Sequence, residues 1–374
     1  MENKGFQALE TSVIKKDLCT FCGACLSLCP YMQSWKGKWV KLDNCDLTEG
    51  RCFAYCPRTQ VDLETLHQET FGQSYSNIEM GLFKKVKMAR ASSPALRKKA
   101  QTAGVVSTLM EFALEEGFIN GAVLTHRATD HLPSGSVIRH PDEILSCAGS
   151  SYVAAPTLQT LNQGPWEEKE RIGVVGTPCQ ILALRKMRGS PLKRTTQIDR
   201  VALIIGLFCT WALTYEPFMK YLKNRVNGGQ IKKLDITPPP ERLLKVITDD
   251  DRIYDVPLDE IRPFIRTSCG VCLDMTSEFS DLSVGTVEGI EGWSTVIIRS
   301  DLGEEIVSRA EAAGRLESRP LPEDNLKHLK EASLLKKKRA LLKLKERGEL
   351  EDGYLILSRE LIGRILAEAK EAES

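Results

Sequence analysis

Residues 171–188 read RIGVVGTPCQILALRKMR, and this stretch decides the fold class. It begins with a mostly apolar run typical of a buried strand, and its QILALRKMR has the pattern of a helix. Residues 121–125 and 201–208 are further apolar runs of strand length, and the helical TYEPFMKYLKNRV follows the second of them. Strands that alternate with helices predict right-handed βαβ units, so we expect an α/β fold with a mainly parallel or mixed sheet.

Four cysteines are expected to meet at one edge of this sheet. Cys179 and Cys209 each follow the carboxyl end of a predicted strand, where ligands bind in open α/β sheets. Cys269 and Cys272 supply a CxxC pair. Four thiolates form a closed metal site, which suits either a [4Fe-4S] cubane or a structural zinc ion. We expect the cubane, because a ferredoxin-type motif is present in the same chain.

This ferredoxin-type motif lies near the N-terminus. Cys19, Cys22, Cys25 and Cys29, followed by Pro30, have the spacing C-x2-C-x2-C-x3-C-P. In bacterial ferredoxins, three of these thiolates hold one cubane and the fourth binds the other cluster. A zinc knuckle normally has two CxxC pairs with a long gap, so iron and sulfur are favoured over zinc and over unliganded core cysteines.

A second motif, CDLTEGRCFAYCP at residues 45–57, repeats the first with one change, because Glu49 stands in place of a cysteine. The crossed ligand pattern of ferredoxins then predicts two groups of thiols. The first cluster takes Cys19, Cys22, Cys25 and Cys56. The second cluster takes Cys29, Cys45 and Cys52, and lacks a fourth thiolate.

Several possibilities remain for the fourth position of the second cluster. Glu49 keeps the ligand spacing to Cys52, whereas Asp46 is a weaker candidate. Cys147 could be recruited from the next domain, or the site could hold a [3Fe-4S] cluster without a fourth ligand, or nothing at all. We favour a second cluster of some kind, because its three cysteines, Gly50 and Pro57 all keep their places.

Two glycine-containing segments could contact a larger cofactor. The run AQTAGVVST, residues 100–108, offers backbone amides at the start of a helix, which suits a phosphate or flavin edge and equally suits close helix packing. In residues 281–295, three glycines surround a bend before Trp293, which could cradle an isoalloxazine ring or simply be a turn with a core tryptophan. Neither GxGxxG after a strand nor GxxxxGK[ST] occurs, so a nucleotide cofactor would bind outside those fingerprints.

Composition limits the remaining functions. The 374 residues include 51 Lys and Arg against 50 Asp and Glu, so no global field attracts nucleic acid or an anionic membrane. The sequence contains neither a signal-peptide core nor an apolar run long enough to span a bilayer, and we expect a cytoplasmic protein. In a reducing cytosol, twelve cysteines indicate metal binding or redox chemistry rather than disulfides.

Four passages resemble the coenzyme F420 hydrogenase/dehydrogenase beta-subunit family: RKKAQTAGVVSTLMEFALEEGFINGAV, GVVGTPCQILALRKM, IGLFC and CGVCLDMTSEFSDLSVGTVEGIEGWSTVIIRSDLG. They cover most of residues 80–310, and GTPCQ with the later CxxCxD is specific. Family members are flavoproteins with FAD and [4Fe-4S] clusters, often with ferredoxin modules. One departure is Ala103-Gly104, where the family commonly has two glycines.

The resemblance implies that Cys179, Cys209, Cys269 and Cys272 hold a cluster next to the flavin. It also implies flavin contacts from four segments, at Gln101, Gly104, Val105, Ser107, Gly149, Ser151, Tyr152, Gly176, Thr177, Pro178, Gly289, Gly292, Trp293 and Thr295.

We therefore expect three parts: a ferredoxin-type module at 1–62, a flavin- and cluster-binding domain at 63–320 and a helical tail at 321–374. The basic run 336–339 in the tail is interpreted as a solvated helix face. The expected function is electron transfer between a hydride carrier, coenzyme F420 or NAD(P)H, and partner redox subunits, through FAD and two or three clusters. The alternative is a non-catalytic iron-sulfur relay or scaffold subunit of a larger complex.

Overall fold

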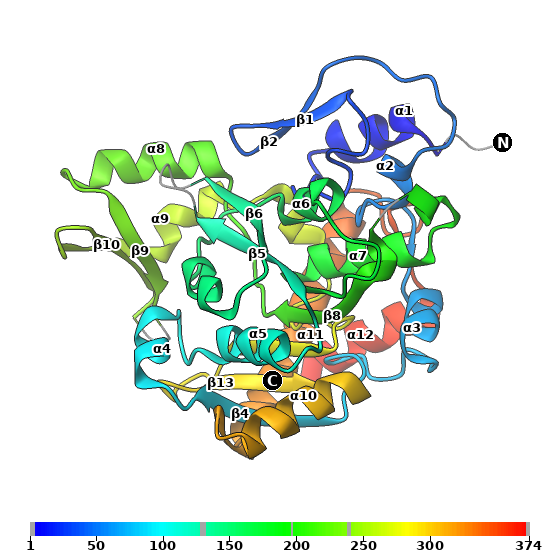
Figure 1. Cartoon of the computed structure of the whole chain (residues 1–374). Coiled ribbons are helices and arrows are strands. Elements are labelled where there is room, and N and C mark those ends of the chain that lie inside the picture. The colour runs from blue at the N-terminus through cyan, green and yellow to red at the C-terminus, as the bar shows by residue number, and fades with distance from the viewer. Residues whose placement is uncertain (1–3, 128–131, 196, 238–240, 372–374) are drawn as a thin grey trace.

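The computed structural model describes residues 4–127, 132–195, 197–237 and 241–371. An eight-stranded sheet forms its centre, and the predicted α/β class with a mixed sheet is confirmed (Figure 1). From one edge to the other, the strands are β14 (Leu316–Pro320), β4 (Lys85–Ala91), β13 (Ser294–Ile298), β12 (Leu282–Thr286), β8 (Val201–Leu207), β7 (Ile172–Gly176), β5 (Gly121–Arg127) and β6 (Pro133–Ile138). The neighbours β12, β8, β7 and β5 pair in parallel, and the outer neighbours pair antiparallel.

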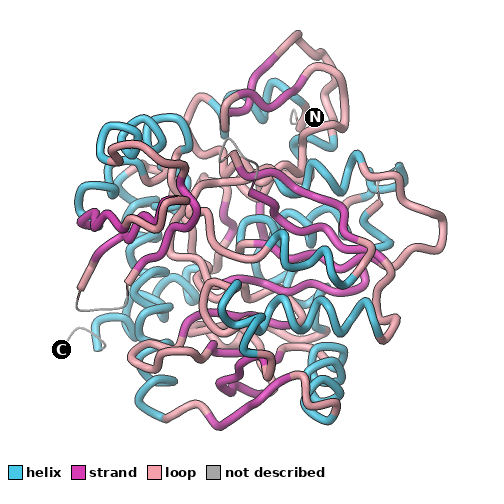
Figure 2. The backbone as a smooth tube through the Cα atoms, turned by 60° about the vertical axis from the view of Figure 1, so that its left-hand side comes forward, coloured by secondary structure: helices cyan, strands magenta, loops and turns pink. Residues whose placement is uncertain are grey.

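Helices cover both faces of the sheet (Figure 2). Helices α5 (Val105–Glu115) and α10 (Asp301–Ala312) pack on one face, and α7 (Pro178–Gly189) packs on the other. The central strands are apolar without a break because they are buried on both sides: Val174 packs in the cluster with α7, and Val175 in the cluster with α5. Helix α4 (Pro94–Lys99) precedes α5, and Gly104 divides the two at a φ of 75°, as the sequence indicated.

The N-terminal module contains α1 (Phe6–Leu9), the hairpin of β1 (Met32–Trp35) and β2 (Lys38–Lys41), and α2 (Arg51–Ala54). It lies at the top of Figure 1, against α6 (Thr157–Gln163). The Leu158 amide donates to the Cys22 carbonyl over 3.1 Å. The module is therefore joined to the central domain directly beside its first cysteine motif.

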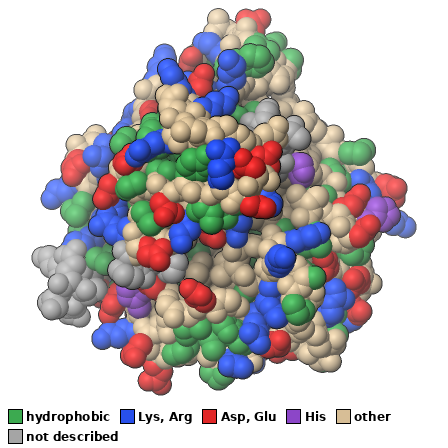
Figure 3. All heavy atoms as spheres, turned by 90° about the vertical axis from the view of Figure 1, so that its left-hand side faces the viewer, with side chains coloured by type: hydrophobic (Ala, Val, Ile, Leu, Met, Phe, Trp, Pro, Cys, Tyr) green, Lys and Arg blue, Asp and Glu red, His purple; other side chains and the backbone are tan. Residues whose placement is uncertain are grey.

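A second, three-stranded sheet was not predicted from the sequence. It consists of β9 (Ile231–Ile236), β10 (Leu243–Thr248) and β11 (Ile253–Pro257), all antiparallel. Helices α8 (Tyr215–Arg225) and α9 (Leu258–Ile261) complete this unit, and its core includes Phe218 and Val246. The face that this unit forms carries charged side chains of both signs interspersed (Figure 3).

The chain ends in α11 (Glu323–Glu346) and α12 (Arg359–Glu371), as the sequence predicted for this region. Between them, β15 (Leu355–Ile356) pairs with β3 (Val61–Asp62), which leads into α3 (Leu63–Phe71). One apolar cluster contains Phe21 of the module, Leu184 of α7 and Leu341 of α11. Three segments far apart in sequence thus share one core. Across the described ranges, no helix is both long enough and apolar enough to span a bilayer.

Part of the basic run in the tail does not form a solvated face. Lys336 and Lys337 have only 6% and 1% of their surface exposed, so that interpretation is wrong for these two residues. The reason is that each ammonium group finds polar partners inside the protein: backbone carbonyls for Lys336 and the carboxylate of Glu278 for Lys337.

Candidate iron-sulfur and cofactor site

A cavity of about 630 Å³ lies at the carboxyl ends of the parallel strands. Thr125 from β5, Gly176 from β7, Leu207 from β8 and Thr286 from β12 all line it. The three-stranded sheet closes another side through Ile236. This is where ligands bind in open α/β sheets, and the volume is in the range of small-molecule sites, about 300–1,000 Å³.

The four cysteines expected at the sheet edge, Cys179, Cys209, Cys269 and Cys272, all line this cavity. We call them the central thiol group. Their charges interact: the pKa of the Cys209 thiol is raised, first by burial and also by the other three cysteines. The group thus contacts the same cavity as part of the predicted cofactor segments.

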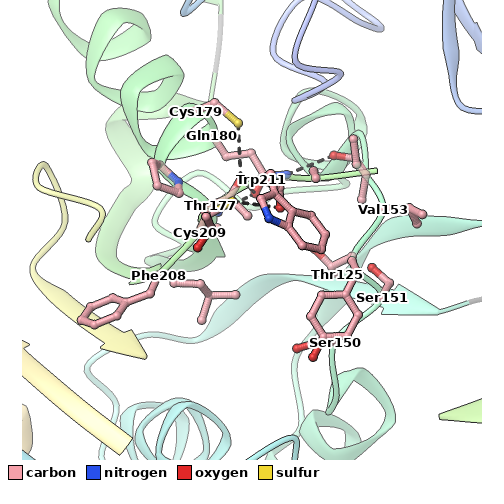
Figure 4. Close-up of a pocket in the computed structure, with 18 of the residues that line it drawn as sticks. Thr125, Ser150, Ser151, Val153, Thr177, Cys179, Gln180, Phe208, Cys209 and Trp211 are labelled. Carbon is pink, nitrogen blue, oxygen red and sulfur yellow. Dashed lines mark hydrogen bonds between the residues drawn. The ribbon is translucent and has the colours of Figure 1, made fainter. Parts of the chain in front are cut away.

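Local sequence explains how Cys179 is positioned. Thr177 is the N-cap of α7, and Pro178 occupies the first turn. The Thr177 amide donates a hydrogen bond to the side-chain oxygen of Gln180 over 2.8 Å. The Thr177 hydroxyl lies 3.4 Å from the Cys179 sulfur. Figure 4 shows this turn beside Cys209, Phe208 and Trp211, which come from the chain after β8. The GTPCQ sequence therefore fixes a thiol at the start of a helix, facing the cavity.

Two buried cations lie beside the central thiol group. Lys336 of α11 donates to the carbonyls of Cys209 and Asp274 over 2.6 and 2.8 Å. Arg58 of the N-terminal module is 2% exposed and donates to the Ser268 carbonyl over 3.2 Å. Burial alone would raise the pKa of the Cys272 thiol, but Lys336 and Arg58 outweigh it and lower this pKa. The site thus favours a thiolate at Cys272, the form that binds metal.

In the N-terminal module, one small cavity is lined by Cys19, Cys22, Cys25 and Cys56, and their role as ligands stays a prediction. The pKa of Cys25 is raised well above its usual value, by burial and then by the charges of Cys22, Cys19 and Cys56. We call these four cysteines the first thiol group. Burial also raises the pKa of Cys52 to about 11, with contributions from Cys29 and Cys45. These last three are the second thiol group.

The three groups follow one another through the molecule. After burial and the cysteines of its own group, the charge of Cys52 in the second group also contributes to the raised pKa of Cys25 in the first group. Besides burial, the charge of Cys179 in the central group contributes to the raised pKa of Cys22 and of Cys19 in the first group. Thr20 lies between Cys19 and Cys22 in the sequence and lines both the small cavity of the module and the large cavity with Cys179, so the first thiol group adjoins the central thiol group.

The fourth position of the second group stays open. Glu49 is exposed, and its backbone forms a short parallel bridge with Lys4. Its role as a ligand stays a prediction, as does that of Asp46, which is also exposed. Cys147 lines the large cavity and packs against the core cluster around α5, and its role as a ligand of the second cluster stays a prediction.

The structure brings part of the predicted flavin segments to the cavity. The lining includes Gly149, Ser151, Tyr152, Gly176, Thr177 and Pro178. Gln101 is linked to this wall, since its side-chain oxygen accepts from the Ser150 amide over 3.0 Å. Its amide nitrogen donates to the Tyr152 hydroxyl over 3.4 Å and to Asp235 over 2.6 Å. The flavin role of these residues stays a prediction.

The other predicted flavin residues do not line the cavity. Trp293 is buried between the guanidinium groups of Arg90 and Arg319, whose centres lie 4.7 and 4.9 Å from its ring. A side chain at Gly104 would come within 2.7 Å of Leu96, which fits close helix packing. The remaining residues outside the lining are Val105, Ser107, Gly289, Gly292 and Thr295.

Sequence reasoning missed Arg58, Lys336 and the aromatic lining of Phe208 and Trp211. Phe208 and Trp211 lie within two residues of the predicted ligand Cys209, and this closeness in sequence was a signal that they contact the site. Arg58 lies two residues after the predicted ligand Cys56 and offered the same kind of signal. Lys336 offered none, because a basic side chain is normally solvated and only the tertiary fold brings this one to the cysteines.

The spacing of the thiols bears on the kind of metal. Within the parts of the chain that the structure describes, no three His, Cys, Asp or Glu side chains are grouped so that they could hold a metal ion. Four thiolates on one zinc share a single atom at about 2.3 Å, whereas in a cubane each thiolate binds a different iron and the sulfurs lie further apart. This finding therefore concerns a mononuclear site and leaves the fit to a [4Fe-4S] cluster intact.

Comparison with known protein families agrees with this site. Sequence models for the coenzyme F420 hydrogenase/dehydrogenase beta subunit match residues 86–162 (N-terminal part) and 169–324 (C-terminal part). A model for a 4Fe-4S binding domain matches residues 12–32, which contain the first cysteine motif.

Individual relatives show the same likeness. The coenzyme F420 hydrogenase subunit beta of Methanothermobacter thermautotrophicus is 31% identical over 277 residues, which are 72% of this chain and 97% of that protein. The coenzyme F420-dependent sulfite reductase of Methanocaldococcus jannaschii is 28% identical over 318 residues, 80% of this chain and 47% of that protein. A chain of the F420-reducing [NiFe] hydrogenase complex from Methanosarcina barkeri, solved with xenon, superposes with a TM-score of 0.65 at 30% identity, over 72% of this chain and 95% of that chain. This protein belongs to the coenzyme F420 hydrogenase/dehydrogenase beta-subunit family and carries a 4Fe-4S binding domain at its N-terminus.

Proposed function

We propose that this chain is the electron-transfer subunit of a cytoplasmic multi-subunit oxidoreductase, in which it connects a hydride carrier with one-electron partner subunits. The central thiol group that lines the cavity, with the first thiol group beside it, carries this proposal. Coenzyme F420 is the carrier we favour, because the names of the relatives refer to it, and NAD(P)H is the alternative.

Two features of the cavity support the proposal that it binds a flavin. Its aromatic side chains, Phe208 and Trp211, offer flat apolar surfaces (Figure 4). At Gly149, φ is 109° and no atom lies within 4 Å of where a side chain would start, so the backbone there is open to a ligand. Bound FAD would supply the exchange between two-electron hydride chemistry and single electrons, and bound [4Fe-4S] clusters would carry the single electrons.

The protein's own residues would bind and orient these groups. The central thiol group supplies four thiolates, and the capped turn at Thr177 fixes the position of Cys179. Tyr152 shapes the opposite wall: its φ of 58° is rare for a bulky residue, and its hydroxyl accepts from the Ile236 amide over 3.1 Å. This contact fixes the three-stranded sheet against the cavity, where it would shield the cofactor from water.

The test is anaerobic purification of the full chain with its co-purifying subunits, followed by visible spectroscopy. We expect flavin absorbance that bleaches when reduced coenzyme F420 is added. Trp211→Ala should lower the flavin content severalfold, whereas Trp35→Ala, whose ring is 65% exposed, should leave it unchanged. A brown protein with iron but without flavin would contradict the flavin assignment and indicate an iron-sulfur relay or scaffold subunit instead.

A further inference from the structure

We propose that the two buried cations Arg58 and Lys336 raise the reduction potential of the cluster held by the central thiol group, and that Arg58 acts on the first N-terminal cluster as well. This inference rests on the proposed electron-transfer function. Both residues lie outside the segments that the family models match, residues 12–32, 86–162 and 169–324. They are therefore contributed by the N-terminal module and the tail to a site in the central domain.

Lys336 reaches the central thiol group from α11. Its ammonium group donates to the carbonyl of Cys209 itself and to that of Asp274, two residues beyond Cys272. The side chain lines the cavity and is 6% exposed, so water screens its charge little. The two hydrogen bonds hold the ammonium group at one place between two of the cysteine-bearing loops.

Arg58 reaches the same group from the opposite part of the chain. It donates to the carbonyls of Pro57 and Ser268, each over 3.2 Å, and its guanidinium stacks 4.9 Å from the ring of Tyr354. Its charge interacts with Cys272 and Cys179. It also interacts with Cys56, two residues earlier, which belongs to the first thiol group. Arg58 thus lies between two thiol groups that would otherwise repel each other.

The electrostatic consequence is direct. Reduction adds one electron to a cluster that its four thiolates already make anionic, and no bond breaks and no proton is needed. A fixed positive charge beside the cluster stabilises the reduced form more than the oxidised form, and the low dielectric of the interior strengthens this effect. Removing the cation should therefore make the cluster harder to reduce.

The contacts predict different results for the two residues. Lys336 acts on Cys209, Cys269 and Cys272, all in the central group. Lys336→Met should lower the potential of the central cluster and leave the N-terminal clusters unchanged. Arg58→Met should lower the potentials of both the central and the first N-terminal cluster. A purely structural role would not produce this division.

The experiment is a redox titration of the anaerobically purified chain, followed by EPR. We expect Lys336→Met to reduce the equilibrium constant for reduction of the central cluster at least tenfold, which is 59 mV for a one-electron couple. Lys336→Arg and Arg58→Lys keep the charge and should stay near the wild type. Arg185→Met is the matched control, because Arg185 is buried on α7 with Cys179 but donates to the Phe279 carbonyl.

An unchanged potential in an iron-replete Lys336→Met protein would overturn the proposal. So would an equal shift in Lys336→Arg, since that variant keeps the charge. If Lys336→Met does not load iron, Arg58→Met compared with Arg58→Lys tests the same claim. Failure of the proposed function itself would look different, because the wild-type protein would then lack flavin absorbance while the cluster potentials of the variants could still be titrated.

Discussion

Neighbouring cations change the pKa of the Cys272 thiol. It is half-buried like Cys209 and Cys269, whose pKa values are raised, yet Lys336 and Arg58 bring its own pKa below the usual value. Because ligation requires thiolates, we expect Cys272→Ser to lose the central cluster, about four irons per chain. Iron and sulfide analysis after anaerobic purification measures this loss. Cys147→Ser is the control, and an equal loss of iron in that variant would contradict the assignment of ligands.

A second prediction concerns a buried ion pair on α11. Lys337 pairs with Glu278, which also accepts from the Tyr75 hydroxyl over 2.5 Å, and both charged side chains are almost completely buried. Lys337→Met should cost about 3–5 kcal/mol of unfolding free energy, because it leaves a buried carboxylate without its cation. Denaturant unfolding measures this cost.

The control for this prediction is Lys343→Met, on the exposed side of the same helix, where the pair with Glu346 contributes little. The double variant Lys337→Met with Glu278→Gln should recover part of the loss, because it removes the unpaired charge. Equal destabilisation by Lys337→Met and Lys343→Met would show that the pair is not buried as described.

At this scale, the sequence predicted that Cys179, Cys209, Cys269 and Cys272 meet at one edge of the sheet, but it did not predict the cations beside them. Ligand spacing is local, so the C-x2-C-x2-C-x3-C-P motif and the CxxC pair indicated their chemistry directly. The position of Lys336 depends on how α11 crosses the cysteine-bearing loops, which no local pattern encodes. Only some of the flavin residues implied by the family resemblance lie at the cavity. Tyr152 lines it, whereas Trp293 packs between two arginines.

Among the elements, the contact between the N-terminal module and α6 is especially tight. Gly23 has a φ of 90°, and an added side chain would lie 2.5 Å from the Pro156 carbonyl oxygen. Gly23→Ala should therefore combine backbone strain of about 1–2 kcal/mol with an overpacking cost of about 1–3 kcal/mol, and should loosen the module. Thermal unfolding and limited proteolysis of residues 1–62 measure the effect.

Gly117→Ala provides the matched comparison, because Gly117 has a similar φ of 67° but nothing within 4 Å of an added side chain. It should show the backbone cost alone and leave the module resistant to protease. If Gly23→Ala behaves like Gly117→Ala in both assays, the close contact with α6 is not present in solution.

Sequence patterns predicted the central strands β5, β7 and β8 because their apolar runs are continuous, and the tail helices because their apolar residues recur with a helical period. The three-stranded sheet was missed: burial alternates along β10 in the structure, but its sequence LLKVIT does not alternate between apolar and polar residues. Its position over the cavity could not be predicted in any case. That position depends on the contact of Tyr152 with Ile236, which joins residues far apart in the chain.

At the scale of the whole molecule, the three predicted parts are interdependent. The N-terminal module contributes Arg58 to the central site, the tail contributes Lys336, and all three parts share one apolar cluster. The parts were visible in the sequence as changes of composition and motif, but their common core was not, because it consists of long-range contacts. We expect the arrangement of the three thiol groups to depend on the intact chain.

The central claim is that the first N-terminal thiol group and the central thiol group hold neighbouring clusters in one electron path. The most direct test is the EPR spectrum of the fully reduced wild-type chain. We predict broadening by magnetic interaction between the two clusters, which should disappear in Cys272→Ser, where only the N-terminal signals should remain. A wild-type spectrum that is the simple sum of independent clusters, or one that Cys272→Ser leaves unchanged, would contradict the account.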